Sequence, residues 1–270
     1  MRQRPVSAPS SILRPSRRAV LGGGLAIGLG GLLGGCSPNG LADPGVIASG
    51  EPQSGGVLRI GIVGGGASDT VDGAVATNLG DIARAVNIYD TLFYRDDDYE
   101  MKPMLATAMA PNEDATVWTV TLREDVLFSD GRPLTADDVV ASIERIIDPD
   151  DPKTGAASLS LVEEVRAADE HTVEILLSSP DAILDDALSE YTITIVPSDY
   201  DVENPIGTGP YMLESFTPAQ STILKANPHY WGDEGPYLDE IELLNFNDTD
   251  ALINALLSTR WCLARRQPER

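Results

Sequence analysis

The chain has 270 residues and a formal net charge of −23, because 42 Asp and Glu outnumber 19 Lys and Arg. This acidic surplus argues against nucleic-acid binding, in which a basic surface supplies most of the affinity. A hydrophobic content of 42% with 23% charged residues is typical of a folded globular protein. Two cysteines (Cys36, Cys262) and two histidines (His171, His229) offer few metal ligands, so we expect no structural metal and no cofactor.

The two ends of the chain differ from its middle in charge. Residues 37–259 hold 41 acidic side chains against 10 basic ones, whereas both ends are rich in Arg. Like charge keeps a protein soluble, and salt limits the resulting self-repulsion to about a Debye length. The acidic middle therefore suits a protein that works in extracellular fluid, although a generally acidic proteome would explain it equally well.

The first 36 residues have the pattern of an export signal. Five Arg precede the apolar run 19–35, which is too short and too rich in Gly to span a bilayer comfortably. The pair Arg17-Arg18 resembles a twin-arginine signal. The run ends in Leu-Leu-Gly-Gly-Cys36, which resembles a bacterial lipobox whose cysteine thiol receives a diacylglycerol; the alternative is a buried or free cysteine.

Residues 37–55 are rich in Pro, Gly, Ser and Asp and predict a flexible tether. Together with the signal at residues 1–36, this tether predicts an exported protein. Its lipid would anchor it to the outer face of the cytoplasmic membrane, and the tether would hold the folded part away from that surface.

A strand-like run beginning at Val57 leads into Gly64-Gly65-Gly66, which superficially matches a dinucleotide-binding fingerprint. That fingerprint needs its last glycine in the first turn of a helix, so that backbone N–H groups meet the pyrophosphate. Here a polar loop follows, with no helical period before Leu79. A core strand that ends in a loop beside a cleft is the simpler interpretation.

The remaining pattern predicts a mixed α/β fold in which strands outnumber helices. Period-two alternation indicates strands, whereas a Thr135–Asp138 capping box precedes a helical apolar face. We expect a helix running into a short strand over 81–93, strands over 118–122, 172–177, 191–196 and 241–246, a turn at 130–131, and helices over 136–147 and 249–257.

Two further stretches combine turn residues with aromatic side chains. Residues 204–211 (NPIGTGPY) place two prolines and two glycines within eight residues, which predicts an unusual backbone path and permits positive φ. Residues 227–241 (NPHYWGDEGPYLDEI) predict a packed aromatic corner that leads into a strand.

Four stretches, in this order, resemble the family 5 extracellular solute-binding proteins, which deliver peptides, nickel complexes or oligosaccharides to ABC importers. The resemblance spans nearly all of residues 55–258. Its four stretches are residues 55–61 (GGVLRIG), 118–140 (WTVTLREDVLFSDGRPLTADDVV), 204–211 and 227–241.

The resemblance implies a mixed α/β fold of the type II periplasmic-binding-protein class with an extra subdomain. Lobe I would be discontinuous, formed by residues 56–78 and 196–258, and residues 79–195 would form the inserted subdomain. Family members continue into a second lobe, so we expect that lobe to be missing here. The family follows the helix at 249–257 with Gly-x-Val/Ile-Asp, whereas here residues 259–270 turn Arg-rich, which predicts an aberrant, out-of-frame tail; a natural short variant is the alternative.

The resemblance also implies a function: a lipid-anchored receptor that binds a small solute, which we expect to be a peptide, and presents it to an ABC permease and its ATPase. Such a receptor is not an enzyme. The charges that anchor peptide termini in the family fall in the missing lobe. The family pattern places these residues of lobe I and the inserted subdomain at the cleft: Gly66, Ser68, Asp69, Asn87, Tyr89, Ser158, Thr208, Gly209 and Tyr211.

Two alternatives stay open: a non-functional truncated fragment of such a receptor and a dinucleotide-binding enzyme. Hydrolase chemistry finds little support, because the chain has neither HExxH spacing nor Gly-x-Ser-x-Gly. The acidic pairs at 137–138 and 163–164 are explained by a helix N-terminus and a solvated face.

Overall fold

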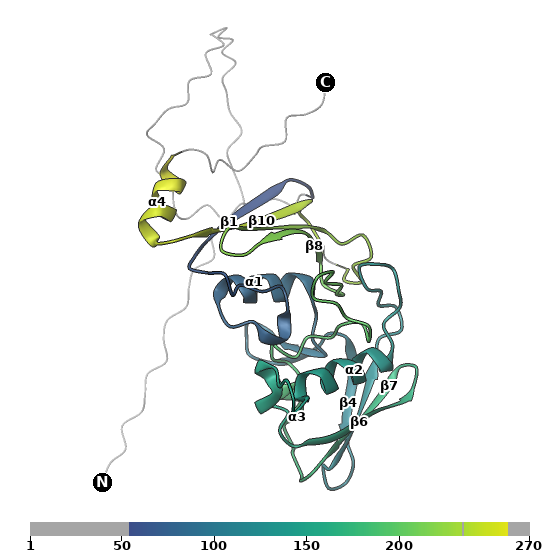
Figure 1. Ribbon diagram of the computed structural model, residues 1–270. Coiled ribbons are helices and arrows are strands. Elements are labelled where there is room, and N and C mark those ends of the chain that lie inside the picture. Colours follow the sequence, from purple (N-terminus) through teal and green to yellow (C-terminus); the bar gives the residue numbers. More distant parts are fainter. Residues whose placement is uncertain (1–53, 234, 259–270) are drawn as a thin grey trace, which may run out of the picture. The chain divides into compact units, whose positions relative to one another are not determined.

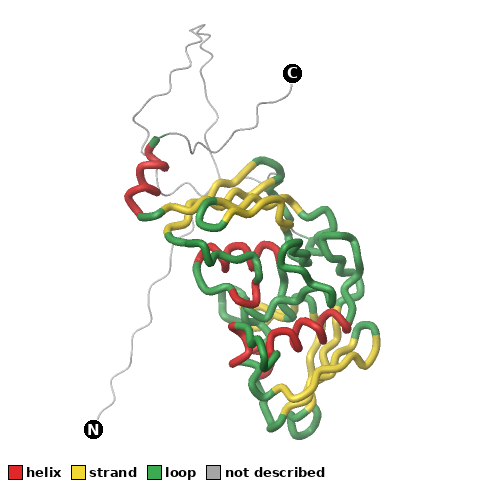
Figure 2. The backbone as a smooth tube through the Cα atoms, viewed as in Figure 1, coloured by secondary structure: helices red, strands yellow, loops and turns green. Residues whose placement is uncertain are grey.

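The computed structural model describes residues 54–233 and 235–258. The predicted export signal (including Arg17, Arg18 and Cys36), most of the predicted tether and the tail from residue 259 lie outside the described residues. Within them the fold is mixed α/β with more strands than helices, as predicted. Two groups of strands are separated by helices and long loops (Figure 2). No helix of the described part is long and apolar enough to cross a bilayer.

In chain order the elements are β1 Val57–Val63, α1 Leu79–Ile88, β2 Phe93–Arg95, β3 Met101–Pro103, β4 Ala106–Pro111, β5 Val117–Leu122, α2 Ala136–Ile147, β6 Val162–Asp169, β7 Thr172–Leu177, α3 Leu184–Ala187, β8 Tyr211–Thr217, β9 Ser221–Ala226, β10 Glu240–Phe246 and α4 Thr249–Leu257. Short 3₁₀ turns cover Gly73–Val75 and Thr154–Ala157.

The first four-stranded sheet has the order β1-β10-β9-β8 and joins the two ends of the described chain (Figure 1). β1 runs parallel to β10, with Val57 opposite Glu240, whereas β10, β9 and β8 form an antiparallel meander. Helix α1 packs beside β8. Ala85, Ile88 and Tyr89 of this region share a hydrophobic cluster with Tyr211 and Leu243 of the sheet.

The second four-stranded sheet has the order β4-β5-β7-β6 and is antiparallel throughout. The predicted period-two strand at residues 118–122 is its β5, in which Trp118, Val120 and Leu122 are buried. Helix α2 packs against β6 and β7 (Figure 1). A larger hydrophobic cluster fills the space between α2 and this sheet.

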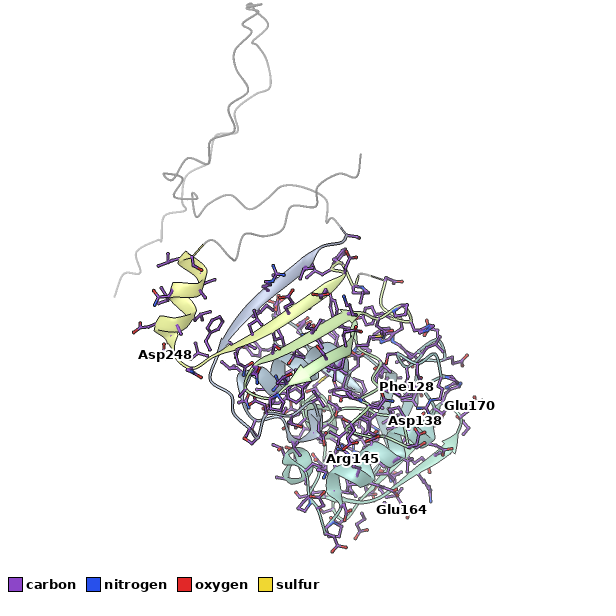
Figure 3. The ribbon with its side chains drawn as sticks, turned by 45° about the horizontal axis from the view of Figure 1, so that its top comes forward. Phe128, Asp138, Arg145, Glu164, Glu170 and Asp248 are labelled. Atoms are coloured by element: carbon purple, nitrogen blue, oxygen red, sulfur yellow. The ribbon has the colours of Figure 1, made fainter. Side chains whose placement is uncertain are left out.

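Helix α2 begins and ends where the sequence predicts. The Thr135 N–H donates to Asp138 Oδ2 at 2.9 Å as part of the capping box, and the Thr135 hydroxyl donates to the same oxygen at 2.9 Å. Asp138 Oδ1 also accepts the Ser198 N–H at 2.9 Å. Asp138 and Arg145 lie along this helix in Figure 3. The capping carboxylate therefore also attaches the 196–200 loop to the helix.

The strand predicted over residues 191–196 is wrong. Residues 191–193 form a turn and a bend, and residues 194–196 belong to no sheet; the segment is buried except for the exposed Tyr191. Its backbone groups bond elsewhere: the Ile195 N–H donates to the Asp90 carbonyl at 3.0 Å, and the Val196 N–H donates to the Ser142 hydroxyl at 2.9 Å. Residues 192–196 are all buried, Thr as well as Ile and Val. The alternation of Thr with apolar residues therefore reflects a segment enclosed by loops and α2 and not a strand with one exposed face.

Helix α4 and the outer strand β1 carry exposed apolar side chains. None of the α4 residues is buried, and Ile253, Leu256 and Leu257 are all exposed. The Asp248 side chain caps the helix by accepting the Ala251 N–H (Figure 3). On β1, Ile60 and Val63 are exposed as well. This end of the first sheet therefore leaves several apolar side chains in contact with solvent.

Candidate functional site

The segment 204–211 passes directly over the C-terminal end of α1. The Gly209 N–H donates to the Ile88 carbonyl at 3.0 Å, and a Cβ at Gly209 would lie 2.7 Å from the Asn87 carbonyl oxygen. A Cβ at Gly207 would overlap the Ile88 carbonyl oxygen. Neither glycine has positive φ, contrary to the freedom we expected from the sequence. These glycines are required because two backbones approach closely.

Asp90 is the polar centre of this crossing. Its Oδ2 accepts hydrogen bonds from the Thr208 hydroxyl and from Trp231 Nε1, both at 2.9 Å. Asp90 is only 2% exposed and Thr208 is fully buried. Burial raises the pKa of the Asp90 carboxyl, and the two hydrogen bonds oppose that rise. The site thus holds a desolvated carboxylate, a group the sequence analysis did not single out.

Tyr89, next to Asp90, is locked in place by its hydroxyl. That hydroxyl donates to the Val71 carbonyl and lies 2.8 Å from the Tyr200 hydroxyl. Arg145 of α2 stacks over the Tyr200 ring and pairs with Asp72. Burial raises the pKa of Tyr89 well above its ordinary value and that of Tyr200 to about 12. Both phenols therefore stay protonated and act as hydrogen-bond groups.

Asp69 organises the loop that follows β1. Its Oδ1 accepts the Gly66 N–H at 2.8 Å, and its Oδ2 accepts the Ala219 N–H at 3.0 Å and the Asn245 amide at 3.1 Å. Ser68 is exposed beside it. α1 begins only at Leu79, far beyond Gly66, and Asn78 caps it. The glycines therefore form no pyrophosphate cradle at a helix N-terminus.

The remaining predicted site residues are scattered around this region. The Asn87 amide donates to the Ala83 carbonyl at 2.8 Å within α1. The exposed Ser158 hydroxyl donates to Glu190 at 2.8 Å. The Tyr211 hydroxyl accepts the Leu238 N–H at 3.3 Å. Asn87, Tyr89, Thr208 and Gly209 therefore come together at the end of α1, and Tyr211 shares the hydrophobic cluster of Tyr89. The Asp69 loop and Ser158 make their hydrogen bonds elsewhere.

A cavity of about 440 Å³ opens beside Tyr89 and Asp90. Its lining joins the end of α1, strand β2 and the residues around and after α3. The sequence analysis predicted Tyr89 as a site residue but none of the other residues that line the cavity. For Asp90 the sequence does offer a signal, because an acidic residue stands inside the apolar run 88–93. The lining residues are Ala85, Val86, Tyr89, Asp90, Thr91, Tyr94, Arg95, Met104, Asp186, Ser189, Glu190, Tyr191 and Thr194.

Comparison with known proteins shows which family has this architecture. The model of the bacterial extracellular solute-binding proteins, family 5, matches residues 100–267, which is more than half of the chain. The chain belongs to this family. This match confirms the family resemblance that the sequence shows. The chain also has the periplasmic-binding-protein fold that the resemblance implies.

Curated family relatives share moderate identity over part of their length. Protein XP55 of Streptomyces lividans is 38% identical over 159 residues, which cover 54% of this chain and 28% of that protein. The glutathione-binding protein GsiB of Salmonella typhi is 30% identical over 182 residues, covering 65% and 34%. The chain thus spans about a third of the length of the curated relatives it matches.

Solved structures with a similar fold are also covered only in part by this chain. AgaA of A. tumefaciens R10, in complex with agropinic acid, is 30% identical with a TM-score of 0.69, covering 75% of this chain and 42% of that one. DppA of Helicobacter pylori, in complex with the peptide STSA, is 27% identical with a TM-score of 0.66, covering 77% and 46%. Solved proteins with this fold thus include one complex with a peptide and one complex with agropinic acid.

Proposed function

We propose that this chain belongs to the extracytoplasmic receptor of an ABC importer and that the imported solute is a peptide. The observation that carries the proposal is the family 5 match over residues 100–267. Supporting it, relatives bear the names glutathione-binding protein and probable D,D-dipeptide-binding periplasmic protein, and the Helicobacter pylori relative was solved with a peptide. The partners would be a permease and its ATPase.

The proposed mechanism is lobe closure without any bond being broken. Solute binds between two lobes, the connecting strands bend, and the closed form engages the permease. We assign residues 56–78 and 196–258 to the core of lobe I and residues 79–195 to the inserted subdomain. Helix α1, at the start of that subdomain range, packs on the lobe I sheet, so the end of α1 is the junction at which solute would lie.

We further propose that Arg17 and Arg18 direct twin-arginine export and that Cys36 carries the lipid. The arrangement that supports this is the Arg-rich start, the Gly-rich apolar run and the Leu-Leu-Gly-Gly-Cys ending. With residues 37–55 as a tether, the receptor would remain on the outer face of the membrane. Labelled palmitate should enter the wild-type chain in its native type of host and should not enter the Cys36→Ala variant.

Solute binding is tested by thermal unfolding of the purified chain against di- and tripeptides, glutathione, a nickel–histidine complex and NAD. A solute at 100 times its dissociation constant stabilises the folded state by about 2.7 kcal/mol, which is a shift of several degrees. We expect at least one peptide to raise the melting temperature and NAD to have no effect. A shift with NAD and none with any peptide would contradict the proposal.

A further inference from the structure

The cavity beside α1 combines deeply buried lining residues with exposed apolar ones. Ala85 and Tyr89 are almost completely buried, whereas Val86, Tyr94 and Tyr191 are exposed to solvent. Its volume of about 440 Å³ is within the usual range of small-molecule pockets. An apolar cavity of about 150 Å³ is already enough to hold benzene. The space is therefore large enough for an aromatic ring that enters from solvent.

The polar side chains deep in the lining are engaged within the fold. The hydroxyls of Tyr89, Thr91 and Ser189 each donate to a backbone carbonyl. The Asp90 carboxylate accepts hydrogen bonds from two side chains that do not line the cavity. A charged group that entered here would lose its hydration without gaining a hydrogen-bond partner in exchange. The interior of the cavity therefore favours an uncharged ligand.

The charges nearer to solvent disfavour anions in particular. Asp186 and Glu190 are exposed lining residues, and Arg95 is the only basic residue among the lining residues described. Arg95 donates through Nε to Asp186 at 2.9 Å and through Nη1 to the Tyr99 carbonyl at 2.9 Å, so its charge is already compensated. A carboxylate or phosphate would thus approach a net negative charge.

Three lining side chains favour an aromatic ring over an aliphatic group of the same size. Tyr94 and Tyr191 offer ring edges and faces, and Met104 offers a polarisable sulfur of the kind that contacts aromatic rings. Contacts between aromatic rings stabilise by more than the area they bury, by an amount that corresponds to about twofold to tenfold in affinity. The lining therefore matches an uncharged aromatic ligand.

We propose that this cavity binds an uncharged aromatic ring, which contacts Val86, Tyr94, Met104 and Tyr191. In the receptor the ring would be a Phe, Tyr or Trp side chain of the imported solute. This last identification rests on the proposed function, whereas the ring site itself does not. The cavity would then favour solutes that carry an aromatic side chain over solutes that lack one.

The test compares phenol with cyclohexanol, which has the same size but no aromatic ring, and with benzoate, which is an aromatic anion. Each is titrated at neutral pH into the ¹⁵N-labelled full chain, and backbone amide shifts are followed by NMR. We expect phenol to bind about threefold or more tighter than cyclohexanol and about tenfold or more tighter than benzoate. The shifted amides should include those of Val86, Tyr94 and Tyr191.

Three results would overturn the proposal. Phenol could fail to bind, its shifts could be confined to other regions, or cyclohexanol or benzoate could bind as tightly as phenol does.

A first pair of variants tests the aromatic wall. Tyr191→Ala removes one ring of the lining and should weaken phenol binding about threefold or more. Tyr237→Ala is the matched control, because Tyr237 is 39% exposed against 41% for Tyr191 and lies outside the lining. It should leave phenol binding unchanged. Equal effects of the two substitutions would contradict a ring site at Tyr191.

A second pair tests the apolar wall on α1. Val86→Asp brings a carboxylate to the cavity from an exposed helix position and should weaken phenol binding about fivefold or more. Leu79→Asp is the matched control, because it adds the same charge to an exposed apolar position of the same helix outside the lining. Undiminished phenol binding in Val86→Asp, or an equal loss in Leu79→Asp, would contradict the site.

The two proposals fail in different ways. If peptides or other solutes stabilise the chain but phenol does not bind in the cavity, the ring site is wrong and the receptor function stands. If phenol binds as expected but no solute of the panel stabilises the chain, the ring site stands and the receptor function is wrong.

Discussion

Arg84 is the largest side chain that the described fold buries completely, with only 1% of it exposed. It pairs with Asp81 one turn earlier in α1, donates through Nε to the Thr70 carbonyl at 2.6 Å, and stacks over the Phe216 ring. Asp81 in turn accepts the Thr70 N–H at 3.0 Å. A buried ion pair thus connects the loop after β1 to α1 and to the first sheet.

Removing one member of this pair leaves the other charge buried and unpaired, which typically costs 3–5 kcal/mol. We expect Arg84→Met to lower the free energy of unfolding by about 3 kcal/mol in urea denaturation. Arg59→Met is the matched control, because Arg59 makes a solvent-exposed pair with Glu242 that is worth less than about 1 kcal/mol. Similar losses in the two variants would contradict the buried role of Arg84.

Asp90 should make stability depend on pH. Its folded-state pKa is raised above the ordinary value of 3.8, so the unfolded chain loses this proton at a lower pH than the folded chain does. The stabilising contribution is therefore present below pH 3.8 and is lost as the pH rises through the folded-state pKa. Asn cannot ionise, so Asp90→Asn should gain melting temperature relative to wild type between about pH 4 and pH 7.

The control for this pH series is the exposed Asp97→Asn, which removes one negative charge from the same acidic chain. The difference between Asp90→Asn and Asp97→Asn isolates the effect of burial. If the difference in melting temperature between the two variants stays constant from pH 4 to pH 7, the Asp90 carboxyl titrates alike in the folded and unfolded chains.

Among the elements, the crossing of segment 204–211 over α1 leaves no room for a side chain. Gly207→Ala would bring its Cβ into the Ile88 carbonyl oxygen, and overpacking of this kind typically costs 1–3 kcal/mol. Gly66→Ala is the matched control, because its Cβ would meet nothing within 4 Å at an ordinary φ. We expect Gly207→Ala to lower the free energy of unfolding by about 2 kcal/mol and Gly66→Ala to change it by less than 1 kcal/mol.

Elements with strong local signals could be predicted from the sequence. The capping box at Thr135 fixes the start of α2, and clean alternation identifies β5 and β7. β6 gave no such signal, because it lies exposed over most of its length, with Val165 as its buried residue. β4, β6 and β8 also contain register shifts that break the period of two. Local pattern cannot show such irregular or exposed strands.

The candidate site could be predicted only in part. The turn-rich segment 204–211 and Tyr89 are visible as motifs, and the structure brings them together at the end of α1. The partners of Asp90 are not visible, because Thr208 and Trp231 are more than a hundred residues away in sequence. Long-range pairing of this kind depends on topology, which a single sequence read by local pattern does not contain.

Across the whole described molecule, backbone amides should differ widely in their protection from hydrogen exchange. β5 and β7 are central strands whose alternate residues are buried, whereas α4 has no buried residue and β1 is an edge strand. Amides with few buried neighbours open locally at low free-energy cost. We expect hydrogen exchange to be slowest in β5 and β7, and at least 100-fold faster in α4 and the outer part of β1. Uniform protection across residues 57–63, 117–122 and 249–257 would contradict this.

The parallel pairing of β1 with β10 also determines when the first sheet can form during synthesis. Arg59 and its partner Glu242 are 183 residues apart, so at 5–20 residues per second the ribosome needs about 10–40 s to supply the partner strand. The second sheet is complete within residues 106–177 and can fold during that interval. Throughout it, β1 has both edges open to pairing with other chains, so a nascent-chain holdase that covers the apolar Val57–Val63 strand would protect the molecule when it is most prone to aggregate.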